Sequence, residues 1–249
     1  MEQKPIRYHL LDEIRGGAII CMVVFHLFFT VCLFSPNGLA IDLINFFTPV
    51  QPLFALLFIF LSGFCGCLSS SNLKRGLKLF CIALLFTLAT YFLSKFDIIS
   101  TIDFGILHLL SVSMILWGLF EKLNLKVNLL FCAIIFFVLF LVTYYVPDQQ
   151  KLAFVVDLPE SLFSNRYLAF LGFPPENYFS DDYYPLIPWL FAFFGGGFFG
   201  KYLKQRGFPK FLEKKRVGFL GFIGRHSLLI YIVHQPIIFG ICLLIDWIF

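Results

Sequence analysis

The chain has 249 residues, of which 59% are hydrophobic, 20% aromatic and only 14% charged, and its mean hydropathy is +0.87. A soluble globular domain of this length could not bury so much apolar surface, so the composition excludes that class and predicts an integral membrane protein. The formal net charge of +4 acquires meaning only when the positive residues are placed on loops.

Long apolar segments follow one another along the whole chain. Their length is that of helices and their polarity does not alternate, which argues against a β-barrel. We therefore expect an all-α polytopic membrane helical bundle with about seven transmembrane helices, forming one domain over residues 1–249. The expected spans are residues 12–34, 50–68, 76–94, 104–120, 127–146, 185–203 and 226–248.

The positions of Lys and Arg predict the orientation of the chain. Of the 19 such residues, only Lys95, Lys151 and Arg166 fall outside one alternate set of loops. Cytoplasmic loops carry the excess of positive charge in membrane proteins. We therefore expect a cytoplasmic N-terminus and an extracytoplasmic C-terminus.

The seven cysteines all lie inside apolar runs. Cys65 and Cys67 are two positions apart, which places them on different faces of a helix and is wrong for chelation. The cysteines are predicted to be small buried hydrophobic residues rather than disulfides or ligands, and no metal site is expected.

The first span carries an ionisable side chain far from its ends. His26 follows Arg15 by eleven residues, which is about 16 Å along a helix and roughly half the hydrocarbon thickness of a bilayer. Ionisable groups at that depth are costly and usually mark a pathway or a reaction site. The alternative is a structural histidine bonded to a carbonyl of a neighbouring helix. Asp12, three residues before Arg15, is expected to pair with it and orient it.

The last span repeats this arrangement. Arg225 stands at its inner boundary, and His234 follows nine residues later, about 13 Å deeper. Because the first and last spans run in the same direction, we expect His26 and His234 to lie at one depth in one cavity. Tyr231 shares a helix face with His234, and Gln235 follows it, so both are expected to line this site.

Acidic and aromatic residues gather at the outer ends of the fourth and sixth spans. Such groups at the mouth of a pocket suit a cationic amine or a sugar, so we expect them to bind an acceptor. A structural role is the alternative for the histidine among them. The residues are Asp103, His108, Asp181, Asp182 and Tyr183.

Three motifs carry a family resemblance: DFGILHLLSVS at 103–113, DYYPLIPWLFAFFGGGFFG at 182–200 and GRHSLLIYIVHQPI at 224–237. The chain resembles, in order and over nearly its whole length, the catalytic domain of heparan-alpha-glucosaminide N-acetyltransferase and its compact bacterial relatives. The segment LDEIRGGAIICMVVFH also looks like the opening of the acyltransferase family three membrane enzymes. Their hallmark is an arginine and a histidine on the first helix, as Arg15 and His26 are here.

The resemblance implies a membrane-embedded acetyltransferase that moves an acetyl group from cytosolic acetyl-CoA to an amino or hydroxyl group of an extracytoplasmic sugar or glycan. It implies a multi-pass protein of the plasma (inner) membrane of a bacterium. The implied partners are acetyl-CoA, a glycan acceptor and the lipid bilayer, with no nucleic acid, and glycine-rich helix faces permit a homodimer. The lysosomal relatives have asparagine at the His26 position, so the role of His26 depends on the family-three motif and on its depth.

His26 and His234 are therefore the expected catalytic residues, with His26 as a general base or as a nucleophile that accepts the acetyl group. The sequence does not distinguish direct transfer from transfer through a covalent acetyl-histidine intermediate. It also does not distinguish an acetyl donor from a longer acyl donor. Tyr231 and Gln235 either donate to the thioester oxygen or fill polar space. Because CoA is anionic, basic groups of the cytoplasmic face should bind it. The alternative is that the positive charges in the loops only set the orientation of the chain in the membrane. The expected donor-binding residues are Arg15, Arg225, Lys74, Arg75, Lys214, Lys215 and Arg216.

A different function class is a small-molecule transporter or exporter. Its histidines would form a proton relay, and Gly195, Gly196 and Gly197 would act as hinges rather than as close helix contacts. The spans show no paired inverted halves, and the polar groups divide into a donor side and an acceptor side, which favours the acetyltransferase. A structural or assembly protein is a third class and would not need buried histidines.

Overall fold

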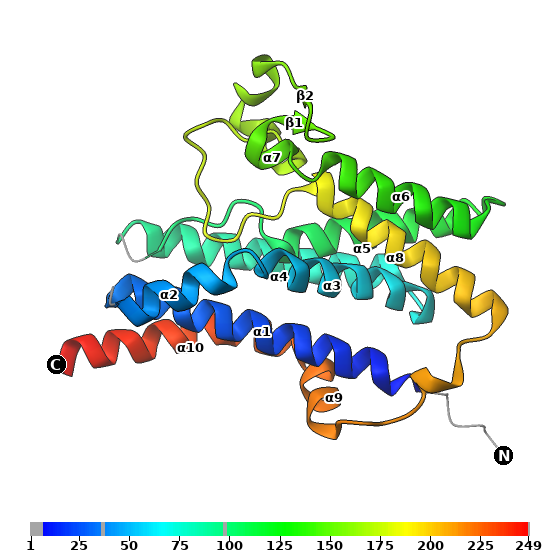
Figure 1. The fold of residues 1–249 in the computed structure, drawn as a ribbon, viewed down its shortest axis with the longest axis horizontal. Coiled ribbons are helices and arrows are strands. Elements are labelled where there is room, and N and C mark those ends of the chain that lie inside the picture. The colour runs from blue at the N-terminus through cyan, green and yellow to red at the C-terminus, as the bar shows by residue number, and fades with distance from the viewer. Residues whose placement is uncertain (1–6, 36–37, 97–98, 249) are drawn as a thin grey trace. The chain divides into compact units, whose positions relative to one another are not determined.

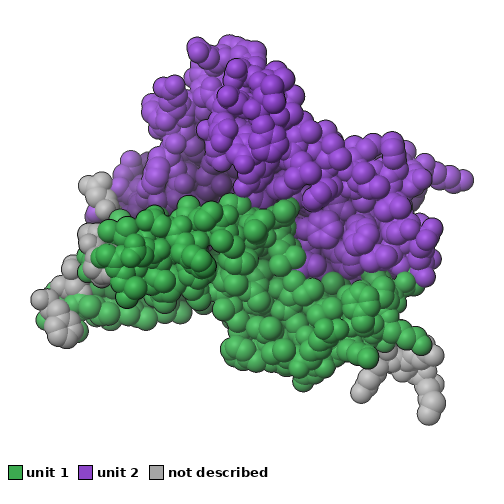
Figure 2. All heavy atoms as spheres, in the orientation of Figure 1, with its two compact units in different colours: residues 1–58, 207–249 green, residues 59–206 purple. Residues whose placement is uncertain are grey.

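The structure, a computed structural model, describes residues 7–35, 38–96 and 99–248. Its elements are helices apart from one antiparallel pair of two-residue strands, β1 (Lys151–Leu152) and β2 (Val156–Asp157), within the described residues. The predicted all-α class is confirmed. The chain forms two compact units, residues 1–58 with 207–249 (unit 1) and residues 59–206 (unit 2), which Figure 2 shows in different colours.

Long apolar helices dominate both units, as expected of a polytopic membrane protein. The expected span at 104–120 corresponds to α5 (Ile106–Lys122), whose 17 residues are at the short end of the range for a membrane crossing. The other expected spans each coincide with one of six helical segments in the described part of the chain that are long and apolar enough to cross a membrane. These are His9–Phe34, Gln51–Leu68, Asn72–Ser94, Leu129–Gln149, Leu186–Arg206 and Ser227–Ile245.

Unit 1 is built on the first and last long helices. Helix α10 packs along α1 in the same direction, and the short helix α9 packs against α1 (Figure 1). Helix α2 is a short apolar helix in a stretch that the sequence predicted as a connection. The elements are α1 (His9–Phe34), α2 (Gly38–Phe47), the first part of α3 (Gln51–Phe64), η4 (Lys210–Leu212), α9 (Gly218–Arg225) and α10 (Ser227–Ile248).

Two glycines allow the backbones of α1 and α9 to touch. A Cβ atom on Gly16 would collide with the carbonyl oxygen of Leu220, and one on Gly224 would collide with the carbonyl oxygen of Asp12. Backbone atoms cannot move aside as a flexible side chain can, so both positions require glycine. The contact places the end of α9, with Arg225, beside the Asp12 turn of α1.

A buried carboxylate fixes the start of α9. Glu13 on α1 is only 4% exposed, and its Oε1 accepts hydrogen bonds from the backbone N–H groups of Arg216, at 2.8 Å, and Val217, at 3.0 Å. Val217 is the N-cap of α9, so Glu13 satisfies donors at that helix end and interacts favourably with its dipole. The end of the basic segment 214–216 is thereby held on α1.

Unit 2 packs α4 against α5 and α6 against α8. Gly196 and Gly200 of α8 face the backbone carbonyls of Phe60 and Phe64 in α3, too close for a Cβ atom, so these glycines serve helix packing. The elements are the rest of α3, η1 (Cys65–Leu68), α4 (Asn72–Ser94), α5, α6 (Leu129–Thr143), α7 (Val146–Gln149), β1, β2, η2 (Glu160–Phe163), η3 (Arg166–Leu171) and α8 (Leu186–Arg206).

Candidate active site

Two imidazole rings from different helices meet inside unit 1. The ring centroids of His26 on α1 and His234 on α10 lie 5.1 Å apart, with the ring planes tilted by 55°. The sequence placed both histidines at one depth on parallel helices, and the structure brings them into contact. The edge of the Phe25 ring also approaches His26, at 5.5 Å between centroids, so the pair has an apolar neighbour.

The hydrogen bonds of His234 define its tautomer. Its Nδ1 lies 2.7 Å from the carbonyl oxygen of Tyr231, and a carbonyl oxygen can only accept, so Nδ1 carries the proton and donates. In the neutral ring, Nε2 then holds a lone pair. This Nε2 is buried and has no hydrogen-bond partner among the described residues. His234 is therefore oriented as an acceptor of a proton or of a hydrogen bond.

Further polar atoms of α1 and α10 lack partners among the described residues. His26 Nδ1 and Gln235 Oε1 are both buried without a hydrogen bond in the part of the chain that the structure describes. The Tyr231 ring lies 5.5 Å from that of His234. Buried polar atoms in proteins are nearly always satisfied, so a cluster of unsatisfied ones indicates a place for a polar ligand. This chemistry fits the thioester and the acceptor group of an acyl transfer.

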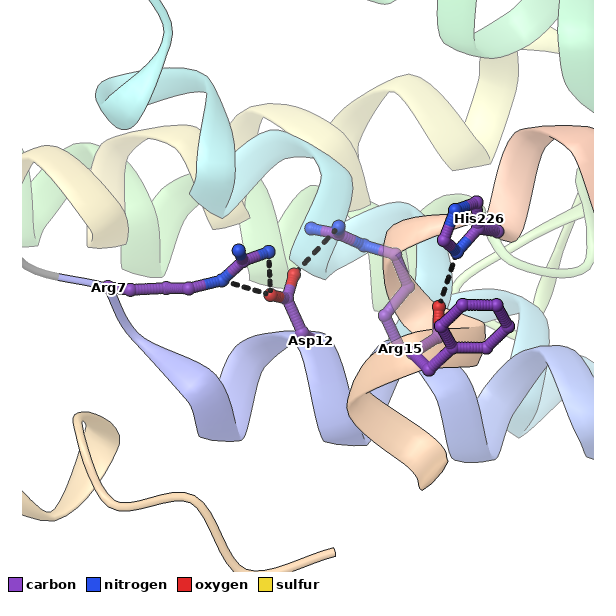
Figure 3. Close-up of polar contacts among 5 residues, drawn as sticks. Arg7, Asp12, Arg15 and His226 are labelled. Atoms are coloured by element: carbon purple, nitrogen blue, oxygen red, sulfur yellow. Dashed lines mark hydrogen bonds and ion pairs between the residues drawn. The ribbon is translucent and has the colours of Figure 1, made fainter. Parts of the chain in front are cut away.

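Asp12 connects two guanidinium groups at the start of α1 (Figure 3). Its Oδ2 accepts hydrogen bonds from Arg7 Nη2 at 2.9 Å and Arg7 Nε at 3.2 Å, while its Oδ1 lies 3.7 Å from Arg15 Nη1. The expected pair of Asp12 with Arg15 is therefore present, although Arg7 makes the closer contact. One carboxylate between two cations leaves this cluster with a net positive charge, which suits an anionic ligand.

Arg225 and His226 form the corner between α9 and α10. Arg225 is exposed, its guanidinium lies 5.9 Å from the Phe222 ring, and it makes no ion pair with any described residue. His226 is held by Phe222, through a 2.9 Å contact from Nδ1 to the carbonyl oxygen and through its ring (Figure 3). Gly224, the residue before Arg225, touches α1 at Asp12, which pairs with Arg15. We therefore group Arg15 and Arg225 as the basic region.

The other expected donor-binding residues are exposed and divide between the units. Lys214, Lys215 and Arg216 belong to the segment that Glu13 anchors in unit 1. Lys74 and Arg75 stand in the first turn of α4 in unit 2, where the Ser71 side chain accepts a hydrogen bond from the Lys74 N–H.

The expected acceptor-binding acids make protein contacts in unit 2. Asp103 pairs with Arg166 at 2.8 Å, Asp181 accepts from the Ser100 N–H at 3.0 Å, and Asp182 accepts from the Ile106 N–H at 3.1 Å. The last contact satisfies a donor at the start of α5. These contacts link the segment 100–106 of unit 2 with Arg166 and with residues 181–182.

Two tyrosines lie near these acids in unit 2. Tyr183 donates its hydroxyl to the carbonyl oxygen of Ala169 at 2.6 Å, and burial raises the pKa of Tyr183, so it remains a donor. Burial, and then the Asp103 carboxylate, raise the pKa of Tyr178 to about 12. Both phenols are therefore neutral at physiological pH.

His108 is also satisfied by protein groups. Its Nδ1 accepts from the Gly105 N–H at 3.3 Å, and its Nε2 lies 3.2 Å from the Thr87 hydroxyl, which donates to the carbonyl oxygen of Ile102. With Nδ1 as an acceptor, Nε2 carries the proton and donates to Thr87. This geometry favours the structural alternative for His108.

The chain is similar to one known protein family over nearly its whole length. The family model described as "Heparan-alpha-glucosaminide N-acetyltransferase, catalytic" matches residues 7–236. The chain belongs to this family. The match includes His26, His234 and both arginines of the basic region, and it joins the apolar helices in identifying a multi-pass membrane protein of an acetyltransferase family. Searches of the curated proteins and of the solved structures found no match.

No role in the site was predicted for two residues near Arg15, Glu13 and Arg7. A signal was available for Glu13, because a carboxylate in the first turns of an apolar helix requires a partner. Its partners, however, are backbone N–H groups about 200 residues away, in the segment at 216–217, and residue types do not reveal such donors.

Proposed function

We propose that this protein is an acetyl-CoA-dependent membrane acetyltransferase in which His26 and His234 form the reaction centre. The acceptor is an amino or hydroxyl group of an extracytoplasmic sugar or glycan. The observation that carries this proposal is the pair of adjacent imidazoles, each with a buried nitrogen that lacks a partner among the described residues, in a chain of the heparan-alpha-glucosaminide N-acetyltransferase catalytic family.

His234 is the group we assign to proton removal. The Tyr231 carbonyl holds the proton on Nδ1, so Nε2 accepts the proton that the acceptor N–H or O–H loses as it attacks the acetyl carbon. Orientation of an imidazole through its other nitrogen is how proteins prepare such a base. The bond between the acetyl carbon and sulfur breaks, and CoA leaves as its thiolate.

His26 acts with His234 as one proton-accepting unit. Two positively charged imidazoles 5.1 Å apart in an apolar region repel strongly, so the neutral pair accepts one additional proton rather than two. The unpartnered Nδ1 of His26 is left to hydrogen-bond to the acceptor or to attack the acetyl carbon itself. Gln235 and Tyr231 line the same centre and orient the reacting groups.

The basic region around Arg15 and Arg225 is the site we assign to the phosphates of the donor. Guanidinium groups bind phosphates through paired hydrogen bonds, and Lys214, Lys215 and Arg216 would add to the attraction. Arg15 and His26 are separated by about 16 Å along α1. The donor must therefore extend a long, largely uncharged arm to the imidazoles, which fits the pantetheine arm of CoA. Lys74 and Arg75 of unit 2 remain proposed donor-binding residues.

Acceptor recognition is then divided between two kinds of residues. Gln235 and the two histidines offer unpartnered atoms and would contact the acceptor directly. The other proposed acceptor-binding residues, Asp103, Asp181, Asp182, Tyr183 and His108, make contacts with protein groups of unit 2, so their proposed part is to hold the segments of unit 2 that they join.

The test uses the full chain purified in detergent or nanodiscs. Binding of acetyl-CoA is measured at increasing salt, and release of free CoA thiol is followed with a panel of amino sugars and hydroxyl sugars. We expect salt-sensitive donor binding and acceptor-dependent CoA release. Absence of donor binding even at low salt would contradict the proposal, whereas binding without release by any sugar would restrict the error to the acceptor.

A further inference from the structure

A pocket of about 600 Å³ opens in unit 2, where α5 ends, α6 begins and α8 ends. The start of α6 and the end of α8 lie on the same side of this unit, at the right of Figure 1. Three lysines line the pocket, Lys201 and Lys204 from α8 and Lys126 from the connection before α6, together with the acid Glu121. Ligand sites are typically of this volume.

Two of these charges neutralise each other. Glu121 Oε1 lies 3.1 Å from Lys201 Nζ, and Glu121 Oε2 accepts a hydrogen bond from Asn72 Nδ2 at 2.8 Å. The Lys201 ammonium also lies 5.2 Å from the centroid of the Trp117 ring. Lys201 and Glu121 are therefore parts of the wall, held in place by their own contacts.

Two ammonium groups remain without a carboxylate partner among the described residues. Lys204 donates to the carbonyl oxygen of Cys67, which satisfies a hydrogen bond but not a charge. Lys126 is exposed and makes no hydrogen bond or ion pair with a described residue. The pocket thus presents about two uncompensated positive charges, which favours an anionic ligand.

The rest of the wall consists of four apolar residues, Phe120, Leu125, Val127 and Leu129, and of the uncharged polar residues Asn124 and Gln205. Leu125 is 56% exposed and Val127 37% exposed, and both line the pocket next to Lys126. The Phe120 ring is packed against Trp117 and Phe198, which holds it in the wall. Exposed leucine and valine beside ammonium groups suit a ligand with an anionic head and hydrocarbon chains.

We propose that this pocket binds the headgroup of an anionic phospholipid. Lys126 and Lys204 would hold the phosphodiester, and Leu125 and Val127 would contact the first part of the acyl chains. The positive-inside expectation puts the connection 123–128 on the cytoplasmic side, at the level of the inner-leaflet headgroups. A single phosphodiester matches two lysines that have no carboxylate partner among the described residues better than CoA with its several phosphates. The site is independent of the reaction proposed at the histidines.

The full chain, reconstituted in phosphatidylcholine nanodiscs with a minor fraction of phosphatidylglycerol, provides the test. Native mass spectrometry counts the phosphatidylglycerol molecules that stay bound. We expect preferential retention by the native chain and at least about fivefold lower retention in Lys126→Glu, since each basic residue near an anionic headgroup contributes roughly that factor. Lys126→Arg should keep the lipid.

Lys122→Glu is the matched control, because it makes the same charge change four residues earlier at an exposed residue that does not line the pocket. It should retain the lipid like the native chain. Equal retention in Lys126→Glu and the native chain, or equal losses in both glutamate variants, would overturn the proposal. Displacement of the lipid by added CoA would also overturn it, by showing that the pocket takes the donor phosphates. Failure of sugar acetylation would leave this lipid measurement unaffected.

Discussion

The imidazole of His26 lies 5.1 Å from that of His234, measured between ring centroids, although the residues belong to the first and last helices of the chain. The contact exists because α10 runs along α1 in the same direction (Figure 1). Each ring has a buried nitrogen without a hydrogen bond to any described residue. Unsatisfied polar atoms inside apolar helices lower stability, so their presence indicates a function.

Replacement of Arg15 by Ala should weaken donor binding first. A lost charge-assisted hydrogen bond to phosphate corresponds to roughly a ten- to hundredfold increase in the Kd for acetyl-CoA. Asp12 keeps its contact with Arg7, which limits structural damage. Arg15→Lys should recover part of the affinity, because it restores the charge but not the paired hydrogen bonds.

Lys95→Ala is the control for this change, since it removes an exposed positive charge from the opposite set of loops. Isothermal titration at two salt concentrations distinguishes the variants. Unchanged affinity and unchanged salt dependence in Arg15→Ala would show that α1 does not hold the donor phosphates.

Glu13→Ala should loosen the basic segment at 214–216. The substitution leaves the N–H groups of Arg216 and Val217 without their acceptor, at a cost of about 1–3 kcal/mol in the free energy of unfolding. We expect a lower Tm and a raised KM for acetyl-CoA, with Glu13→Gln showing a smaller change. Asp42→Ala removes an exposed acid from α2 and should change neither quantity. A native Tm in Glu13→Ala would refute the anchoring role.

The glycine contact between α1 and α9 offers a comparison of adjacent residues. Gly16→Ala introduces a Cβ against the Leu220 carbonyl, whereas a Cβ on Gly17 meets nothing within 4 Å. The first change should destabilise the protein by at least about 1–3 kcal/mol, as overpacking does. Gly17→Ala should be neutral or slightly stabilising, since alanine favours a helix. Thermal unfolding followed by size-exclusion chromatography measures both, and equal Tm values would contradict the close contact.

The position of the histidine pair was predictable because it depends on simple helix geometry. Apolar length marks a span, and the residue count from Arg15 to His26 and from Arg225 to His234 gives a depth at 1.5 Å per residue. With seven expected spans, the first and the last cross the membrane in the same direction, so equal depths put both rings at one level. The tautomer of His234 could not be predicted from the sequence, because it depends on the hydrogen bond to the Tyr231 carbonyl.

The contacts of Asp181 and Asp182 could not be predicted from residue type. Asp181 and Asp182 resemble ligand-binding acids in the sequence, but their oxygens accept from the backbone N–H groups of Ser100 and Ile106. Backbone donors belong to every residue, so a sequence does not show which carboxylate they will use.

The most direct test of the reaction centre is a transfer assay in parallel with donor binding for His26→Ala and His234→Ala. General-base catalysis contributes about 10²–10⁴-fold, so acetyl transfer should fall by at least about a hundredfold in His234→Ala. The Kd for acetyl-CoA should remain close to native in both variants, since the phosphates bind elsewhere. His9→Ala, which removes a histidine from the first turn of α1, should transfer at the native rate. Native transfer by both His26→Ala and His234→Ala would contradict the central claim.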